Sequence, residues 1–353
     1  MNRYVSFLAV LCVLSCITAQ AAVQYTVIDL GTLGGSYSYA TQINASGQVV
    51  GFAEAAIGQF PFLYSGGKMI NLGGGGGSIA FGINDSGLVV GFFGPFHAFL
   101  YSGGNMQDLG TLYGDTGFSS AEGINATNQI VGESTYNSEG DAFHAFLYSG
   151  GNMTDLGALM NFDNISNATA INDSGEIVVN ANSVGALQHA FLYSCGKMTD
   201  LGDLGGGWSE GREINARGQI VGHSATASGD SQAFLYSNGS MKNLNTIGLS
   251  QSMAYGINSN GQVVGMAITS NKSYAFLYTE EVMIDLNNLI NPSSGLILQE
   301  AVSINDSGQI VCNGLTATRQ AHAFLLTPVP EPSAISLIIV GTFSLLTFAL
   351  GRG

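Results

Sequence analysis

The sequence predicts an all-β fold, a seven-bladed β-propeller of four-stranded antiparallel blades. Three observations predict it: a four-part pattern recurs seven times, two spacings inside the pattern never change, and the chain ends supply the two parts of one divided repeat. A period of 40 to 47 residues with several short apolar runs per unit is typical of propellers. The Asn of the first part recurs at Asn44, Asn84, Asn125, Asn172, Asn215, Asn258 and Asn305.

One complete copy shows the four parts in order. They are residues 80–84 (AFGIN), 87–91 (GLVVG), 97–101 (HAFLY) and 105–110 (NMQDLG). Each part is a short run rich in apolar, β-branched or aromatic residues, and turn-forming residues separate them. Each copy therefore predicts four strands, which is the content of one propeller blade.

Two connections in each repeat have a fixed length, which predicts tight hairpins. The Asn of the first strand is always seven residues before the end of the Val-Val-Gly run, and the Phe of the third strand is nine residues before the Asp or Asn of the fourth. A Gly or Asn inside the first hairpin predicts a left-handed backbone, and Gly-Gly or Asn-Gly inside the second predicts a two-residue turn.

The other two connections vary, from 8 to 14 and from 13 to 20 residues. Alternate connections of an up-and-down blade lie on opposite faces of the ring. All variable loops therefore share one face, and variable loops on a rigid scaffold are where function concentrates.

The chain ends predict how the ring closes. The chain begins with a fourth-type strand, residues 25–30, and ends with a third-type strand, residues 322–326. Pairing the C-terminal His-Ala-Phe strand with the N-terminal Asp-Leu-Gly strand would close the ring and protect both strand edges. A parallel solenoid is the alternative fold, but its turns need not contain two antiparallel hairpins per unit. Which of the four strands lines the channel stays open.

The HAFLY and DLG elements also carry a resemblance to a known family. Across residues 25–326 the chain resembles the HAF-repeat family of extracellular repeat proteins. The resemblance implies a repeat fold and an exported location, and it implies no particular activity.

Residues 1–21 have the features of a secretory signal peptide. Met1 and Arg3 give a positive start, residues 4–17 are mostly apolar, and residues 19–21 (AQA) form a small-x-small cleavage site. We therefore expect a propeller domain over residues 22–328 of an exported protein.

The C-terminal residues 329–353 carry a second targeting pattern. Pro330, Glu331 and Pro332 precede an apolar stretch over 334–350, and Arg352 follows it. Seventeen apolar residues are at the lower limit for a transmembrane helix. The segment resembles the PEP-CTERM sorting signal of exported bacterial proteins. The resemblance implies an exosortase-type sorting enzyme as a partner, and a cell-surface or extracellular destination, often with exopolysaccharide. A plain C-terminal membrane anchor is the alternative.

Composition restricts the partners. Only 9% of residues are charged, yet the formal net charge is −15. Such a surface repels nucleic acid and anionic lipid, and it is compatible with cations, neutral glycans or basic proteins. The sequence has no phosphate loop, dinucleotide fingerprint or zinc spacing. We expect no cofactor. Calcium is the one ion that the carboxylates of the variable loops could bind.

Several residues are of types that occur in catalytic or metal sites, but in this sequence they have structural explanations. One repeat position holds His97, His144, His189 and His322, but it also holds Phe60, Gln232 and Tyr274. An aromatic hydrocarbon cannot replace a metal ligand, so these residues are expected to be structural. The Asp of Asp-Leu-Gly alternates with Asn, which predicts an acceptor for backbone N–H groups. Residues 207–211 (GWSEG) match a nucleophile-elbow pattern by chance, because the motif needs a strand-turn-helix context.

The predicted binding surface combines aromatic and acidic residues of the variable connections. Aromatic rings stack on sugars, and carboxylates accept hydrogen bonds from hydroxyl groups. We predict a binding or structural module of the cell envelope or matrix, associated with exopolysaccharide or surface proteins. A glycan hydrolase or lyase with two convergent carboxylates and a passive structural protein are the alternatives. No catalytic residue is singled out. The predicted binding residues are Tyr37, Tyr113, Asp115, Tyr136, Asp141, Trp208 and Glu210.

Overall fold

The computed structural model describes residues 25–330, except 95, 115, 138–141, 159–164, 183–186, 246–247 and 271. Residues 25–328 form one compact unit. The predicted signal peptide lies outside the described residues, and so does the sorting segment beyond Pro330. Within the described part of the chain, no helix has the length and apolar character that a membrane crossing requires.

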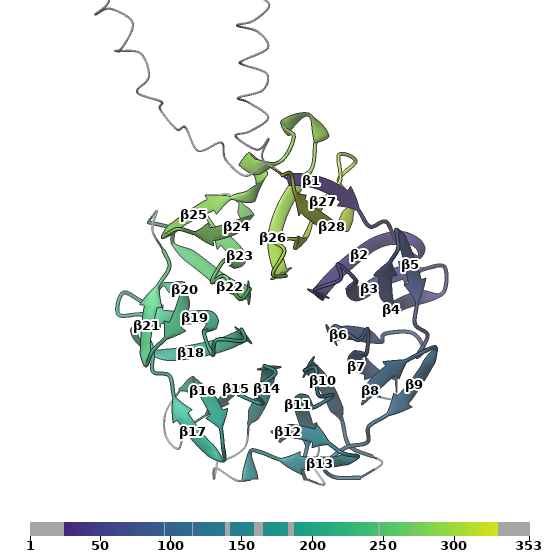
Figure 1. Cartoon of the computed structure of the whole chain (residues 1–353), viewed down its shortest axis with the longest axis vertical. Helices are drawn as coiled ribbons and strands as arrows, with labels where there is room; N and C mark the ends of the chain where they lie inside the picture. The colour runs from purple at the N-terminus through teal and green to yellow at the C-terminus, as the bar shows by residue number, and fades with distance from the viewer. Residues whose placement is uncertain are drawn as a thin grey trace, which may run out of the picture. The chain divides into compact units, whose positions relative to one another are not determined.

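The described residues form seven four-stranded antiparallel sheets arranged as blades around a central axis (Figure 1). The predicted seven-bladed propeller is confirmed. The strands of blades one to three are β2 (Gly34–Ile43), β3 (Val49–Ala55), β4 (Gly58–Ser65) and β5 (Lys68–Asn71); β6 (Ile79–Ile83), β7 (Val89–Phe93), β8 (His97–Ser102) and β9 (Asn105–Asp108); and β10 (Ser119–Ile124), β11 (Ile130–Thr135), β12 (Phe143–Ser149) and β13 (Asn152–Asp155).

The remaining blades follow the same order, and two short 3-10 helices, η2 (Leu286–Leu289) and η3 (Pro292–Ser294), precede the last blade. Their strands are β14 (Ser166–Ile171), β15 (Ile177–Asn182), β16 (Gln188–Ser194) and β17 (Lys197–Asp200); β18 (Gly205–Ile214), β19 (Ile220–Thr226), β20 (Ser231–Ser237) and β21 (Ser240–Asn243); β22 (Gln251–Ile257), β23 (Val263–Ile268), β24 (Ser273–Thr279) and β25 (Val282–Asp285); and β26 (Ile297–Ile304), β27 (Ile310–Leu315), β28 (Ala321–Pro328) and β1 (Tyr25–Asp29).

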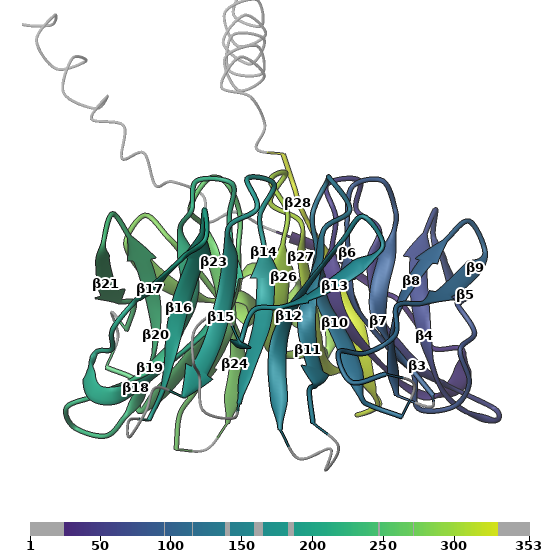
Figure 2. The same ribbon diagram turned by 90° about the horizontal axis from the view of Figure 1, so that it is seen from below.

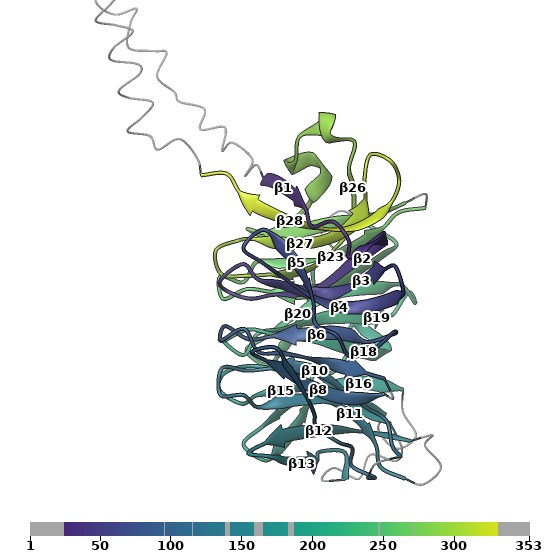
Figure 3. The same cartoon turned by 90° about the vertical axis from the view of Figure 1, so that its right-hand side faces the viewer.

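The first strand of each repeat lies innermost and lines the central channel (Figure 1), which settles the question that the sequence leaves open. Ring closure is as predicted. The N-terminal strand β1 pairs antiparallel with the C-terminal strand β28, from Tyr25 opposite Pro328 to Asp29 opposite Phe324 (Figure 3). The seventh blade therefore joins both ends of the domain, so neither strand leaves an unpaired edge there.

Both predicted hairpins form, along one face of the ring (Figure 2). In the first hairpin Gly47 has φ 76° and its one non-glycine equivalent, Asn128, has φ 62°. In the second, Gly66 and Gly67 have φ 58° and 79°, as a type I′ turn requires. The antiparallel order places the variable connections on the opposite face.

Seven hydrophobic clusters form the core, mostly between neighbouring blades. The Phe of His-Ala-Phe is buried in every blade, and Phe62, Phe99 and Phe146 have no exposed surface. One cluster joins Val311 and Leu325 of the last blade to Ile43 and Val49 of the first. Apolar packing therefore continues across the closure, so the ring has a continuous core.

A closed ring of hydrogen bonds links the seven repeated Asn residues. Each donates from Nδ2 to the backbone carbonyl of the equivalent Asn in the next blade, at 3.0 to 3.2 Å. The side-chain oxygen accepts N–H groups of its own turn, as Asn44 Oδ1 does from Ser46 and Gln48. The predicted turn role is confirmed, and the same side chain also joins adjacent blades.

Candidate functional site

Every innermost strand carries a β-bulge at the same repeat position, three residues before the Asn. A bulge leaves one residue outside the pairing ladder and redirects its side chain. All seven bulge residues line one cavity in the channel. They are Thr41, Phe81, Glu122, Thr169, Arg212, Tyr255 and Val302.

This channel cavity has a volume of about 430 Å³, which is in the range of small-ligand sites. Other lining residues come from the neighbouring positions of the inner strands and from the second strands. Tyr39 and Phe52 stack with ring centroids 5.3 Å apart and planes inclined by 22°. Both rings line the cavity, as do Glu213 and Glu300. The cavity therefore combines aromatic rings, carboxyl groups and one guanidinium group.

The positive charge of Arg212 already has partners. Its Nη2 atom lies 2.7 Å from Glu210 Oε1, and its guanidinium carbon lies 6.0 Å from the centroid of the Tyr255 ring. The Arg212 side chain is 41% exposed, so it reaches open space in the channel. Burial raises the pKa of Tyr255 to about 12, and its hydroxyl is therefore a neutral donor at physiological pH.

Two carboxyl groups in the cavity wall have strongly raised pKa values. Burial raises the pKa of Glu122 to about 7, against the hydrogen bond from Ser120, and the nearby carboxylate of Glu133 adds to the rise. Burial also raises the pKa of Glu213 to about 7, against hydrogen bonds from Ile214 N–H and the Gln42 side chain. Both groups are therefore partly protonated near neutral pH.

His223 joins two of the predicted binding residues beside the cavity. The Trp208 and His223 rings meet edge-to-face with centroids 5.0 Å apart, and His223 Nε2 lies 3.8 Å from Glu210 Oε2. Burial, and then the positive charge of Arg212, lower the pKa of His223 to about 4. The imidazole is therefore neutral at pH 7, and it packs against the indole as an aromatic ring.

The other predicted residues do not converge on one point. Tyr37 lies 6.0 Å from Tyr39 between ring centroids, at the edge of the channel cavity. Tyr136 stacks on His144 at 3.6 Å, and Tyr113 is 44% exposed. Asp115 and Asp141 lie outside the described residues. Tyr37, Trp208 and Glu210 belong to inner strands β2 and β18 rather than to loops.

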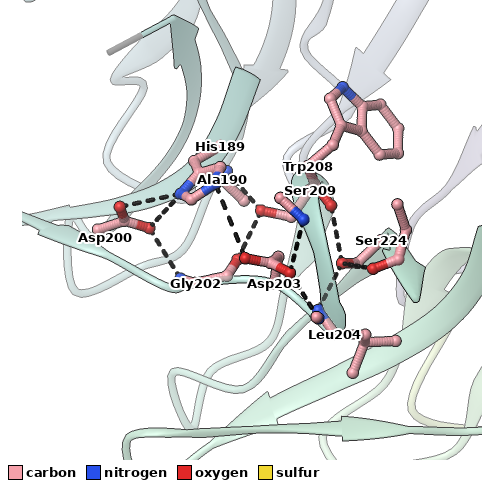
Figure 4. Close-up of polar contacts among 12 residues, drawn as sticks. His189, Ala190, Asp200, Gly202, Asp203, Leu204, Trp208, Ser209 and Ser224 are labelled. Carbon is pink, nitrogen blue, oxygen red and sulfur yellow. Dashed lines mark hydrogen bonds and ion pairs between the residues drawn. The ribbon is translucent and has the colours of Figure 1, made fainter. Parts of the chain in front are cut away.

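The nucleophile-elbow pattern forms part of strand β18. Ser209 Oγ accepts the N–H of Ala190 at 3.0 Å and donates to the carbonyl of Gly202 at 2.7 Å (Figure 4). The Trp208 indole points away from this network (Figure 4). Equivalent serines, including Ser38 and Ser119, accept an N–H from the preceding blade in the same way. Ser209 is therefore a structural link between blades.

The repeated His and Asp residues bind each other. His97 Nδ1 lies 2.9 Å from Asp108 Oδ2, and the pair that joins His189 to Asp200 is drawn in Figure 4. At the closure, His322 Nδ1 lies 2.8 Å from Asp29 Oδ1. The Asp also accepts a turn N–H, as Asp108 does from Gly110 at 2.7 Å. The predicted structural roles of the His and of the Asp are both confirmed. The sequence did not predict that the two side chains bind each other.

Four residues of the Asn ring, Asn44, Asn84, Asn125 and Asn305, line a second, smaller cavity of about 210 Å³ at the hairpin face. Three acidic residues lie there, but each already accepts a backbone N–H from the preceding blade; Asp85, for example, accepts from Ala45 at 2.9 Å. Within the described residues, no group of three or more His, Cys, Asp or Glu side chains is placed to hold a metal ion.

Sequence reasoning missed the ring of bulge residues. Its signal is nevertheless in the repeats. The residue before the bulge is always Ala or Gly, and Ile-Asn always ends the strand, whereas the bulge position holds polar, acidic, basic, aromatic and aliphatic residues. A position that differs between copies of an otherwise uniform strand marks a surface free of packing constraints.

No protein-family model and no curated protein matches the chain. Among solved structures, TolB from Acinetobacter baumannii is 14% identical, with 81% of each chain covered and a TM-score of 0.41. An acylaminoacyl peptidase from Pyrococcus horikoshii is 13% identical over 84% of this chain and 53% of its own, with a TM-score of 0.48. The Aleuria aurantia lectin is 12% identical over 86% of this chain and 100% of its own, with a TM-score of 0.39. These likenesses say nothing about the ligand or activity of this chain.

Proposed function

We propose that this chain is an exported ligand-binding module and that its binding site is the channel cavity. One observation carries the proposal: seven equivalent bulges direct seven chemically varied side chains into one cavity of about 430 Å³. A purely structural channel would need only one small side chain repeated seven times. Variety at this one position, on an otherwise repeated scaffold, supports recognition of an asymmetric ligand.

The side chains suit a glycan. Tyr39, Phe52, Phe81 and Tyr255 offer ring faces for the C–H surfaces of a sugar. The carboxyl groups of the wall offer acceptors, and in their protonated form donors, for hydroxyl groups. Exopolysaccharide of the producing bacterium is therefore the proposed ligand. Export through the predicted signal peptide and sorting through the PEP-CTERM-like segment are part of the same proposal, and they rest on the sequence alone.

The test is calorimetric titration of the protein with oligosaccharide fragments of that exopolysaccharide. Tyr255→Ala should weaken binding about tenfold, the loss of one stacking contact of about 1.4 kcal/mol. Tyr113→Ala, a matched exposed tyrosine away from the cavity, should bind like the wild type. If Tyr113→Ala weakens binding and Tyr255→Ala does not, the site is the loop face. If no fragment binds, the propeller is a passive structural protein or binds other proteins.

A glycan hydrolase is the second candidate, and one observation favours it. Glu122 has a pKa of about 7, as a general acid requires, and its neighbour Glu133, whose pKa burial also raises, is a second carboxyl group. Hydrolysis would release reducing ends during the same titration. If reducing ends are released and Glu122→Gln abolishes the release, the protein is a glycan hydrolase. If the number of reducing ends stays constant, the protein only binds the glycan.

A further inference from the structure

The channel cavity has more acidic groups than its cation can balance. Glu122, Glu213 and Glu300 line it, and Arg212 is the one cationic side chain among its described lining residues. Arg212 is already held at 2.7 Å by Glu210, which lies beside the cavity. The three lining carboxyl groups therefore share one cation, which lowers the pKa of Glu122 but is itself paired with Glu210.

Each of these carboxyl groups has only neutral hydrogen-bond donors in the described contacts. Ser120 Oγ donates to Glu122 at 2.6 Å, Ile214 N–H donates to Glu213 at 3.1 Å, and Asn313 Nδ2 donates to Glu300 at 3.0 Å. Burying a carboxylate against neutral groups is unfavourable, and a cation in the cavity would relieve that cost. The raised pKa values of Glu122 and Glu213 are the expected result of such an environment.

Aromatic rings complete the same walls. Arg212 already lies 6.0 Å from the Tyr255 centroid, and the stacked Tyr39 and Phe52 rings lie on another part of the wall. Ring faces attract organic cations. The described residues hold no group of metal ligands. Carboxyl groups, ring faces and room for about one or two sugar units together suit an organic ammonium group better than a metal ion.

We infer that the channel cavity selects a glycan unit that carries a free amine, such as a glucosamine residue, over its neutral N-acetylated counterpart. This inference rests on the proposed function, because it names the ligand class of the same site. The ammonium group would bind to the carboxyl groups that line the cavity, Glu213 among them, and the sugar ring would stack on the aromatic wall. Acetylation removes the charge and adds bulk, so it would remove the main attraction.

The probes are the tetramer of β-1,4-linked glucosamine and the tetramer of N-acetylglucosamine, titrated into the full chain at pH 6.5. Trp208, the single tryptophan of the chain, provides a fluorescence signal on the inner strand β18, and calorimetry provides the affinity. The glucosamine tetramer should bind at least about tenfold more tightly, and Glu213→Gln should remove most of that preference.

The matched control is Glu176→Gln. Glu176 follows the first hairpin turn of its blade and does not line the channel cavity. Its carboxylate accepts a hydrogen bond from Asn172 Nδ2 at 2.7 Å, and most other repeats have Gln at this position. This variant should keep the full preference, although it also replaces one carboxyl group by an amide. Equal loss in both variants would mean that the preference reflects net charge alone and would overturn the inference.

A second readout is proton release. Glu122, whose charged neighbours are Glu133 and Arg212, and Glu213, whose hydrogen-bond partners are neutral, both titrate close to neutral pH. An ammonium ligand should therefore displace protons from them. The binding heat at pH 7 should therefore differ between phosphate and Tris buffers. Equal affinity of the two tetramers would overturn the inference while the proposed function stands. If exopolysaccharide fragments do not bind either, both fail.

Discussion

Asn305 donates a hydrogen bond from Nδ2 to the backbone carbonyl of Asn44, at 3.1 Å, across 261 positions of sequence. This bond is the last of seven equivalent bonds, and it makes the ring of Asn side chains continuous. The same Asn305 side chain accepts the N–H of Gln309 at 3.0 Å and donates to its Oε1 at 2.9 Å. One buried amide therefore stabilises its own hairpin and the closure of the propeller.

Asn305→Ala should lower the free energy of unfolding by about 1–3 kcal/mol, because buried partners lose their hydrogen bonds. Equilibrium unfolding in urea measures this change. The matched control is Asn105→Ala, at an exposed position at the start of β9, which should change stability by less than about 0.5 kcal/mol. Equal effects of the two substitutions would contradict a structural role for the Asn ring.

The pair of His322 and Asp29 should act as a coupled unit across the closure. The first blade has Phe60 and Asn71 at these positions, so the double variant His322→Phe/Asp29→Asn imports a combination that the fold already contains. A double-mutant cycle should give a coupling energy of about 0.5–1 kcal/mol, reduced by the partial exposure of Asp29.

The control cycle for this pair combines Asp29→Asn with His97→Phe. His97 pairs with Asp108 in another blade, so these two changes should be additive within about 0.5 kcal/mol. A coupling energy as large in the control cycle as in the closure pair would show that the effect is not pairwise.

Glu122 should make the protein less stable as the pH rises. Its pKa is about 7 in the folded protein and near its ordinary value of 4.5 when unfolded, so the folded state binds the proton more tightly. The contribution is therefore most favourable below about pH 4.5, falls between about pH 4.5 and 7, and is constant above that range.

Glu122→Gln should remove this decline, and its stability relative to the wild type should improve by about 1–2 kcal/mol between pH 5 and 8, after allowance for solvent screening. Urea unfolding at several pH values measures the difference, in which the opposite contribution of His223 cancels. Parallel pH profiles for the wild type and Glu122→Gln would disprove the assignment.

Arg212→Gln should raise the pKa of His223. Burial, and then the positive charge of Arg212, lower that pKa to about 4, so removing the positive charge leaves the effect of burial. NMR titration of the imidazole protons measures the shift. Arg217→Gln, an exposed arginine in the hairpin that follows β18, is the matched control and should leave the titration unchanged. No shift in Arg212→Gln would mean that the two side chains do not interact.

Most of the fold follows from the sequence, because each repeat specifies its own strands and turns. The positions of Gly47 and Asn128 predict the left-handed turn residues, and both have positive φ. The end strands predict the pairing of β1 with β28. These features depend on the local conformational preferences of residues and on the spacing between repeated motifs, and both can be read from the sequence.

The sequence predicts much less of the candidate site. The variation between repeats marks the bulge position, but the bulge itself depends on a slip in pairing between two strands. Residue types alone therefore do not predict the direction of the Glu122 or Tyr255 side chain. Trp208 was expected in a loop because of the neighbouring glycines, but β18 extends to Gly205 and includes it. The pairing of His97 with Asp108 needs the register of two strands as well as the spacing of 11 residues.

The measurement that tests the central claim most directly is a crystal structure of the protein with a bound exopolysaccharide fragment. The account predicts a sugar unit inside the channel cavity, in contact with Tyr255 and Glu213. A fragment bound instead on the variable loops near Tyr113, with the channel unchanged, would contradict it.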